Sequence, residues 1–208
     1  VKFARWAFEK FKGIKDRLGT QMRAVGEVMS IGKTYKEAFQ KAVRSLENGR
    51  YGLGFAKDFN RRTLEELLAM LSEPSSERHF IMYEAIRKGA DLDEIHRRTF
   101  VKHWFLNQMA ELVALEEKIL SHRGGEVPAE LLKQAKLDGF SDRYLAGLLN
   151  LPETKIREMR IAAGARKAWN EIPVSGVGNA AYYYSTYNAP DTTKTSGRKK
   201  AIVLGGGP

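Results

Sequence analysis

Helix-start and helix-end signals follow one another from residue 34 to about residue 168. Thr34 with Glu37, and Thr63 with Glu66, have the spacing of a capping box, in which hydroxyl and carboxylate each accept a bond from the other residue's backbone amide. Apolar residues behind these signals recur with the period of an amphipathic helix. The sequence therefore predicts a mainly α fold, an irregular helical bundle at about 57–168 with short flanking α/β fragments.

The predicted helices have start signals at Thr34, Thr63, Pro74-Ser75-Ser76, Asp91, Phe100, Pro128, Ser141 and Pro152. The first helix is expected to end at Gly49 and to bury the face formed by Ala38, Phe39, Ala42, Val43 and Leu46. The longest is expected to extend from Phe100 to His122, with an apolar stripe of Val101, Phe105, Met109, Leu112 and Leu115 or Glu116. Trp104, Leu106 and Val113 widen this stripe, which predicts self-association, most simply as a dimer. Complete burial within one chain is the alternative.

The two ends of the chain lack this helical pattern. Glycines at 13, 19, 26 and 32 divide the first segment into short pieces, which predicts strands and turns at the edge of a mixed domain. Beyond Trp169 the composition favours a linker with at most one strand. Ala201–Leu204 is strand-like and leads into Gly205–Pro208, and such a glycine-rich loop normally precedes a helix. Because that helix is missing and Val1 is not a methionine, the chain is expected to be part of a longer protein.

Charge and cysteine content restrict the function classes. The 208 residues carry 35 basic and 25 acidic side chains, a formal charge of +10, which favours contact with polyanions. The charges are spread over the whole chain, so a solvated basic surface is preferred over a nucleic-acid footprint. The sequence has no cysteine, no signal pattern and no apolar run near the roughly 18 residues of a membrane span. A cytoplasmic location is expected.

The histidines and carboxylates do not form a convincing metal motif. Of His79, His96, His103 and His122, only His96 and His103 can share a helical face, and neither has a third ligand at metal spacing. Glu111, Glu116 and Glu117 are expected on the solvated face of the long helix. We therefore predict no metal, catalytic or cofactor-binding residue in this chain.

Three further features could indicate nucleic-acid or phosphate binding. The Gly205–Pro208 run without its helix does not establish a phosphate loop. The tyrosines at 182, 183, 184 and 187 could stack on bases, although use in a strand or in packing is preferred. Residues 139–164 have the outline of a helix-turn-helix, with Lys155, Arg157 and Arg160 on its second helix, and a nucleic-acid-binding module is the alternative function. A stand-alone helical scaffold is a further alternative.

The order of several segments resembles one known family, the large subunit of carbamoyl phosphate synthase. The segments near the N-terminus are Phe8–Phe11, Leu18–Met22, Val25–Met29, Ile31–Thr34 and Glu37. They resemble the end of the first ATP-grasp unit of that subunit. His103–Leu106 with Glu111–Lys118, and Gly139–Asp142 with Leu145-Ala146 and Ile156-Arg157, resemble its central oligomerization domain. Tyr184–Tyr187 and Val203–Pro208 resemble the entry to its second half.

The resemblance implies three segments and a function. Residues 1–49 would be the C-terminal tail of the first ATP-grasp (carboxyphosphate) unit, 50–169 the helical oligomerization domain, and 170–208 a linker with the first strand of the second synthetase half. The parent enzyme would be an ATP-dependent ligase that makes carbamoyl phosphate from bicarbonate, ammonia from glutamine, and ATP, in arginine and pyrimidine biosynthesis.

The resemblance also implies partners and cofactors. The partners would be the rest of the large subunit, a glutaminase small subunit and a second copy of the chain, with no specific nucleic acid and no membrane. ATP and Mg or Mn would bind in the parent enzyme, outside this chain, which alone is expected to be inactive. Ala4, where the family usually has proline, and residues 170–181 depart from the family pattern.

Overall fold

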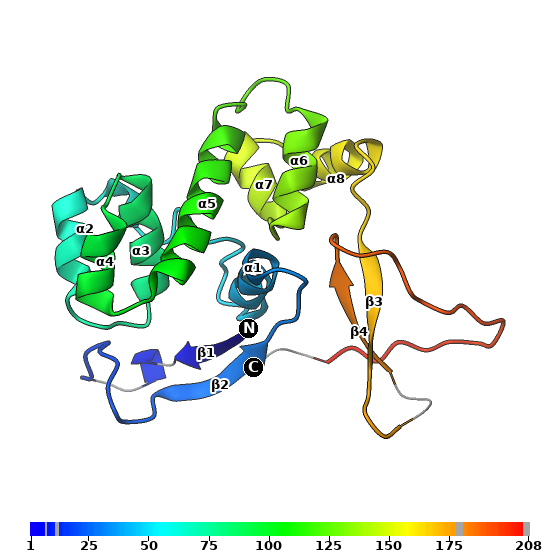
Figure 1. The fold of residues 1–208 in the computed structure, drawn as a ribbon, viewed down its shortest axis with the longest axis horizontal. Helices are drawn as coiled ribbons and strands as arrows, with labels where there is room; N and C mark the ends of the chain where they lie inside the picture. Colours follow the sequence, from blue (N-terminus) through cyan, green and yellow to red (C-terminus); the bar gives the residue numbers. More distant parts are fainter. Residues whose placement is uncertain (7, 11–12, 178–180, 206–208) are drawn as a thin grey trace.

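The computed structural model describes residues 1–6, 8–10, 13–177 and 181–205 (Figure 1). Within these residues eight α-helices are accompanied by two short antiparallel strand pairs, one near each end of the chain. The mainly α fold, a helical bundle with short flanking fragments, is confirmed.

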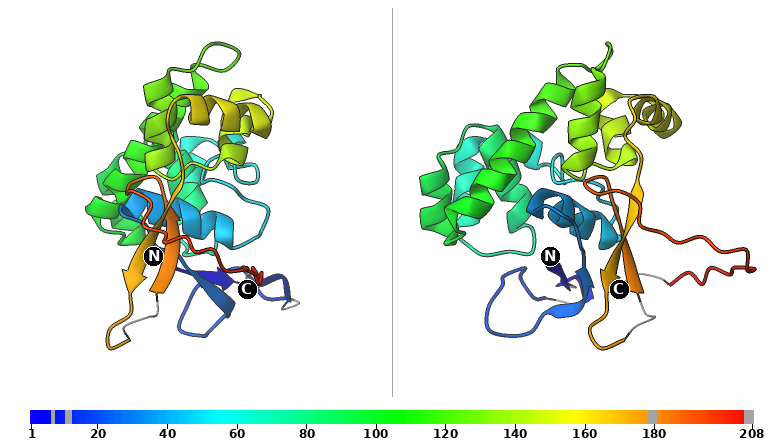
Figure 2. Two further views of the ribbon diagram at one scale, coloured as in Figure 1. Left: turned by 90° about the vertical axis from the view of Figure 1, so that its right-hand side faces the viewer. Right: turned by 45° about the vertical axis from the view of Figure 1, so that its right-hand side comes forward.

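The helices are α1 (Tyr35–Ser45), α2 (Leu64–Leu71), α3 (Arg78–Arg87), α4 (Leu92–Thr99), α5 (His103–Leu120), α6 (Ala129–Leu137), α7 (Asp142–Leu149) and α8 (Glu153–Ala162). Single 3-10 turns occur at Phe8–Lys10 and Phe59–Arg61. The longest helix, α5, lies between two groups of shorter ones, with α2, α3 and α4 on one side and α6, α7 and α8 on the other (Figures 1 and 2). Because α1 also packs against α5, the long helix organises the whole bundle.

The core forms where the predicted apolar faces meet. Ala42 and Val43 of α1 are fully buried, and the other predicted members of that face are also in the core. On α5, Leu106, Met109 and Leu112 are buried, whereas the neighbouring Phe105 points partly to solvent. The α5 stripe therefore lies mostly inside this chain, and of the residues that widen it Leu106 and Val113 are buried whereas Trp104 is exposed.

The N-terminal strand pair is attached to the bundle. β1 (Lys2–Trp6) pairs with β2 (Ala24–Met29), with Lys2 opposite Met29, and the register shifts between Arg5 and Trp6. The ring of Phe3 lies 6.0 Å from that of Phe39 on α1 and 5.0 Å from that of His79 on α3. The strands and turns expected in the first 32 residues are confirmed, and they pack on helices of the core.

The C-terminal region differs from its prediction. β3 (Ala168–Pro173) pairs with β4 (Ala181–Thr186), so the expectation of at most one strand is wrong. The polar residues and Pro173 of β3 are untypical of a strand, so the sequence did not indicate it. Its partner β4 is the tyrosine-rich segment. No strand forms at Ala201–Leu204, because an isolated extended segment finds no ladder partner among the described residues. Gly206, Gly207 and Pro208 lie outside the described residues.

Three helix ends differ from the capping signals, two because of a left-handed residue and one because of a tertiary contact. α1 ends at Ser45 and not at Gly49, since Glu47 adopts a left-handed conformation (φ 52°). α3 begins at Arg78 because the amide and hydroxyl of Ser76 are both bonded to Asp16, at 2.9 and 2.6 Å. α5 begins at His103 because Phe100, with φ 58°, terminates α4.

The two predicted capping boxes also have different outcomes. The box of Thr63 and Glu66 forms completely. Thr34 Oγ1 accepts from the Glu37 amide at 3.2 Å, but the Glu37 carboxylate accepts from the Lys33 amide and from Asn188, at 2.9 and 3.0 Å. The box of Thr34 and Glu37 is therefore only half formed, because the Glu37 carboxylate accepts from other residues, one of them far along the chain.

Candidate functional site

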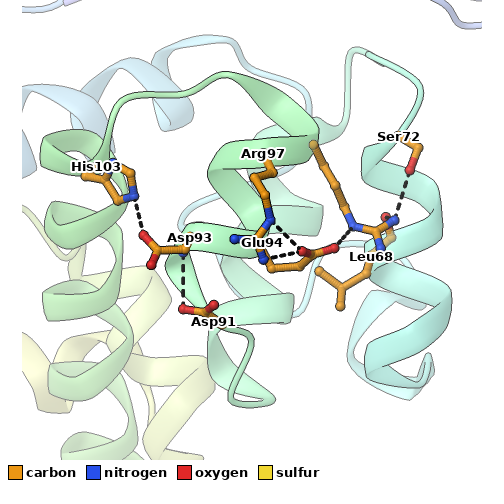
Figure 3. A network of polar contacts seen from close by, with 8 residues as sticks. Leu68, Ser72, Asp91, Asp93, Glu94, Arg97 and His103 are labelled. Atoms are coloured by element: carbon orange, nitrogen blue, oxygen red, sulfur yellow. Dashed lines mark hydrogen bonds and ion pairs between the residues drawn. The ribbon is translucent and has the colours of Figure 1, made fainter.

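Two of the four histidines meet, but His96 lies on α4 and His103 on α5, so they do not share one helical face as their spacing allowed. The rings of His96 and His103 lie 4.4 Å apart. His103 Nε2 is 2.7 Å from Asp93 Oδ1 (Figure 3). His96 Nδ1 lies 2.8 Å from the Val101 carbonyl oxygen. No group of three or more His, Asp or Glu in the described part of the chain is placed to hold a metal ion. His103 therefore connects the start of α5 to the first turn of α4, His96 holds the turn between the two helices, and the absence of a metal site stays a prediction.

The same end of the bundle carries an exposed ion-pair network on α4. Glu94 accepts from Arg97 at 2.6 Å and from Arg98 at 2.5 Å, and Arg98 also bonds the Leu68 carbonyl and the Ser72 hydroxyl on α2 (Figure 3). These contacts join two helices at the surface and engage both oxygens of the Glu94 carboxylate. The network is structural.

Glu116 corrects the expectation of a solvated carboxylate. Its side chain is 0% exposed, and it accepts hydrogen bonds from the hydroxyls of Tyr83 at 2.7 Å and Tyr144 at 3.0 Å. The Arg87 guanidinium forms an ion pair with Glu116 and another with Glu84, the latter at 3.0 Å. α3, α5 and α7 are thus joined through one buried charged cluster, the Arg87 cluster.

The protonation states in the Arg87 cluster follow from its burial. Burial alone would lower the pKa of Arg87, but the two facing carboxylates Glu116 and Glu84 raise it above its ordinary value. Burial, together with the charge of Glu116, holds the pKa of the Tyr83 and Tyr144 phenols well above the ordinary value. Both tyrosines therefore remain donors, and every charge is engaged within the protein.

The turn before α2 closes the Arg87 cluster. The Phe55 amide donates to Glu84 Oε1 at 2.6 Å. A Cβ at Gly54 would lie 2.5 Å from both Arg87 Nη2 and Glu116 Oε1, so only glycine allows this approach. A substrate has no access to these carboxylates, and the cluster stabilises the packing of α3, α5 and α7.

Aromatic side chains form an exposed ridge where α1 meets α5. Tyr35 lies 5.2 Å from Trp104 and 5.3 Å from Phe105, measured between ring centroids. Trp104 is 55% exposed and Phe105 40% exposed. Phe100, 80% exposed, lines the same shallow hollow as Tyr35 and Phe105. These four residues, the aromatic ridge, are the apolar surface that the long helix and its neighbour leave uncovered.

Comparison with known proteins identifies the family to which this chain is related. A family described as "Carbamoyl-phosphate synthetase large chain, oligomerisation domain" matches residues 27–164, which is more than half of the chain. The chain belongs to this oligomerisation-domain family. The match begins in β2 and ends after α8, so it includes the ridge and the Arg87 cluster.

Relatives of the oligomerisation domain come from distant organisms. They include the carbamoyl phosphate synthase large chains of Archaeoglobus fulgidus, 40% identical over 215 residues, and Neisseria meningitidis, 39% identical over 213 residues. The "Carbamoyl phosphate synthase arginine-specific large chain, chloroplastic" of Arabidopsis thaliana is 37% identical over 215 residues. Each match covers 100% of this chain and 18% to 20% of the relative. The chain thus spans about a fifth of the length of these relatives.

The helix-turn-helix alternative is not supported within the oligomerisation domain. α7 and α8 do follow each other across a tight turn, with Asn150 in a left-handed conformation. Arg160, however, points inward, where Nε donates to Asp142 at 2.7 Å and Nη1 to the Ala165 carbonyl at 3.2 Å. Lys155 Nζ lies 3.7 Å from Glu158 Oε2 on the same helix. A recognition helix needs its basic side chains free for base edges and phosphates, and Arg160 is not free, although Lys155 and Arg157 are exposed.

The tyrosine cluster serves the C-terminal hairpin, as preferred from the sequence. Tyr182, Tyr183 and Tyr184 lie on β4, and the Tyr184 hydroxyl donates to Asn170 on β3 at 2.9 Å. Tyr187 follows the strand and lies 5.0 Å beneath the Lys136 ammonium. None of the described helices combines the length and hydropathy needed to cross a membrane.

Sequence reasoning missed the buried charges. Glu116 occupies a position of the apolar stripe of α5, one turn before the buried Ile119, and this register was the available signal. Lys136 follows the fully buried Ala135 in α6 and is itself buried, which the sequence does not reveal. Its Nζ donates to the Phe140 carbonyl at 2.5 Å and to Asp142 at 2.6 Å.

Proposed function

We propose that this chain is the oligomerisation and linker segment of a carbamoyl phosphate synthase large chain. The observation that carries the proposal is the match of the whole chain to large chains from an archaeon, a bacterium and a plant. The parent protein would be an ATP-dependent ligase that forms carbamoyl phosphate from bicarbonate, ammonia released from glutamine, and ATP. The arginine-specific relative supports a place in arginine biosynthesis.

The chain would contribute structure and not chemistry. The most deeply buried carboxylates, Glu84 and Glu116, are both occupied by Arg87, so neither is offered to a metal or a substrate. We therefore assign no catalytic, cofactor-binding or metal-binding residue here, and ATP and Mg or Mn would bind elsewhere in the parent. The division into 1–49, 50–169 and 170–208, the glutaminase small subunit as partner and the cytoplasmic location stay predictions.

Self-association would use the aromatic ridge. Exposed aromatic side chains at the contact of two helices are typical of protein interfaces, where their large area is removed from water. Trp104 projects most from α5 within this group, while Leu106 on the same helix is fully buried. Trp104 and Phe105 are thus the residues of the predicted α5 stripe within the ridge that remain available to a partner.

The test compares two aromatic-to-glutamate variants of the full-length large chain. Trp104→Glu is expected to shift the sedimentation-derived mass towards smaller species, because a carboxylate at an interface centre loses its hydration. The control, Tyr182→Glu, changes a 72% exposed aromatic residue on β4, away from the ridge, and is expected to keep the wild-type mass. Equal masses for all three proteins over a concentration series would remove the ridge from the interface.

The proposal that the parent protein is a carbamoyl phosphate synthase is tested separately, by measuring carbamoyl phosphate formation. The full-length protein is expected to form carbamoyl phosphate from bicarbonate, ATP and a nitrogen donor, and the 208-residue chain is expected to form none. Turnover by the purified 208-residue chain, with contaminating enzyme excluded, would contradict the structural assignment.

A further inference from the structure

A basic pocket lies between the helical domain and the C-terminal hairpin. It has a volume of about 280 Å³ and is bordered by α1, the turn between α6 and α7, α8 and the end of β4. Five basic side chains line it, namely Lys41, Arg44, Lys136, Arg160 and Lys167. Three carboxylates line it as well, from Glu37, Asp142 and Glu153. We call this site the seam pocket, and its lining carries a surplus of two positive charges.

The carboxylates neutralise only part of the basic set. Asp142 pairs with both Lys136 at 2.6 Å and Arg160 at 2.7 Å. Glu37 is turned to the Lys33 amide and to Asn188. Asp142 thus pairs with two cations, whereas the Glu37 carboxylate accepts hydrogen bonds at the start of α1 and from Asn188 after the hairpin.

The remaining three cations have no carboxylate within ion-pair distance among the described residues. Arg44 Nη1 donates to the Gly139 carbonyl at 2.8 Å, and Lys41 Nζ to the carbonyls of Ile31 and Ser185 at 2.5 and 2.7 Å. The ammonium of the exposed Lys167 lies 5.6 Å from the centre of the Trp169 ring. Carbonyl groups offer only partial charges, so Glu37 and Asp142 offset the positive charge of Lys41 and Arg44 from a distance and not through direct ion pairs.

Burial lowers the pKa of three of these basic groups, and neighbouring cations lower the pKa of the two lysines among them further. Burial lowers the pKa of Lys41 despite nearby Glu37, and Arg44 and Lys167 lower it further. Burial likewise lowers the pKa of Arg44, and it lowers that of Lys136 to about 8, where Arg160 and Arg44 act in the same direction. An anion in the pocket would relieve this repulsion.

We propose that the seam pocket binds an oxyanion of the phosphate class. Ammonium and guanidinium groups that converge from separate elements form charge-assisted hydrogen bonds with phosphate oxygens, and arginine can do so with two parallel bonds. Tyr187 also lines the pocket, and no hydrogen bond engages its hydroxyl in the described part of the chain. It can therefore donate to a bound oxygen.

The position of the seam pocket gives the anion a structural role. Ser185 and Tyr187 come from β4 and the residues just after it, while Arg44 and Arg160 come from α1 and α8. Asn188 already joins this segment to the helices through Glu37 and the Leu137 carbonyl. A bound anion adds ionic contacts across the same seam, so it would hold the hairpin against the helical domain.

The experiment is a calorimetric titration of the 208-residue chain with inorganic phosphate at pH 7 and constant ionic strength. Wild type is expected to give a saturable one-site isotherm. Lys167→Gln and Lys41→Gln are each expected to raise Kd by about three- to tenfold, because each removes one charged donor. Lys167→Gln affects an exposed residue without an ion pair, so it leaves the fold intact.

The matched control is Lys118→Gln, which removes an exposed lysine of α5 outside the pocket and is expected to keep the wild-type Kd. Phosphate is also expected to slow amide exchange in 168–173 and 181–186. A second titration with glycerol 3-phosphate separates the sources: tighter binding assigns a phosphomonoester, and equal or weaker binding assigns the inorganic ion. Absence of saturable heat, or the same Kd for Lys167→Gln, Lys118→Gln and wild type, would overturn the proposal.

Discussion

The bundle contains two buried charged clusters of opposite character. In the Arg87 cluster one guanidinium faces the carboxylates of Glu84 and Glu116, and two tyrosine hydroxyls complete the bonding. In the seam pocket Lys136 and Arg160 share the single carboxylate of Asp142, and further cations surround them. Removal from water penalises a charge in both places, and the sign of the neighbouring charges decides whether that penalty is offset.

The difference in charge balance between the two clusters shifts the pKa values of Arg87 and Lys136 in opposite directions. The pKa of Arg87 lies above its ordinary value because carboxylates outnumber it. Burial lowers the pKa of Lys136 to about 8 because Asp142 does not offset the loss of water. One cluster therefore stabilises the fold through its charges, whereas the other holds an unfavourable charge that a ligand can use.

The largest effect is expected for Arg87→Met. The change leaves Glu84 and Glu116 buried without their cation, and the free energy of unfolding should fall by about 3–5 kcal/mol. The free energy of unfolding is measured by urea denaturation of the variant and of wild type. The control is Arg97→Met, which breaks an exposed pair with Glu94 and should cost below about 1 kcal/mol. Similar losses in the two variants would show that the Arg87 cluster contributes no more than a surface pair.

A smaller effect is expected from pH. Between pH 8 and 10.5 the unfolded chain keeps the Lys136 proton that the folded chain has released, so the free energy of unfolding rises with pH in this range. From pH 8 to 9.5 the contribution is up to about 2 kcal/mol. The difference between wild type and Lys136→Met, measured in urea at each pH, should grow accordingly. A flat or falling difference would contradict the lowered pKa.

The smallest effect is expected for Lys136→Met at pH 7. Methionine retains much of the side-chain volume, removes a poorly compensated charge, and leaves Asp142 paired with Arg160, so stability should stay within about 1 kcal/mol of wild type. Lys133→Met on the same helix, where Lys133 pairs with Glu130 at the surface, is the matched control. A loss as large as that of Arg87→Met would remove the distinction between the clusters.

Local signals predicted much of the helical part. The capping residues Thr63, Asp91 and Ser141 begin the helices that they announce, because a cap acts on amides only two or three residues away. The buried face of α1 also follows from its period. Pairing of β3 with β4 was missed, since a strand is stable only with a partner and neither segment identifies the other.

The sequence by itself determined where helices form and which faces of them are apolar, since both depend on neighbours within about one or two turns. Tertiary structure alone decided that Glu116 faces Arg87, that Trp104 stays exposed while Leu106 is buried, and that Lys41, Arg44 and Lys167 gather at one pocket. The physical reason is that burial and charge balance arise from residues far apart in the chain. Their energies depend on which groups share the space from which water is removed.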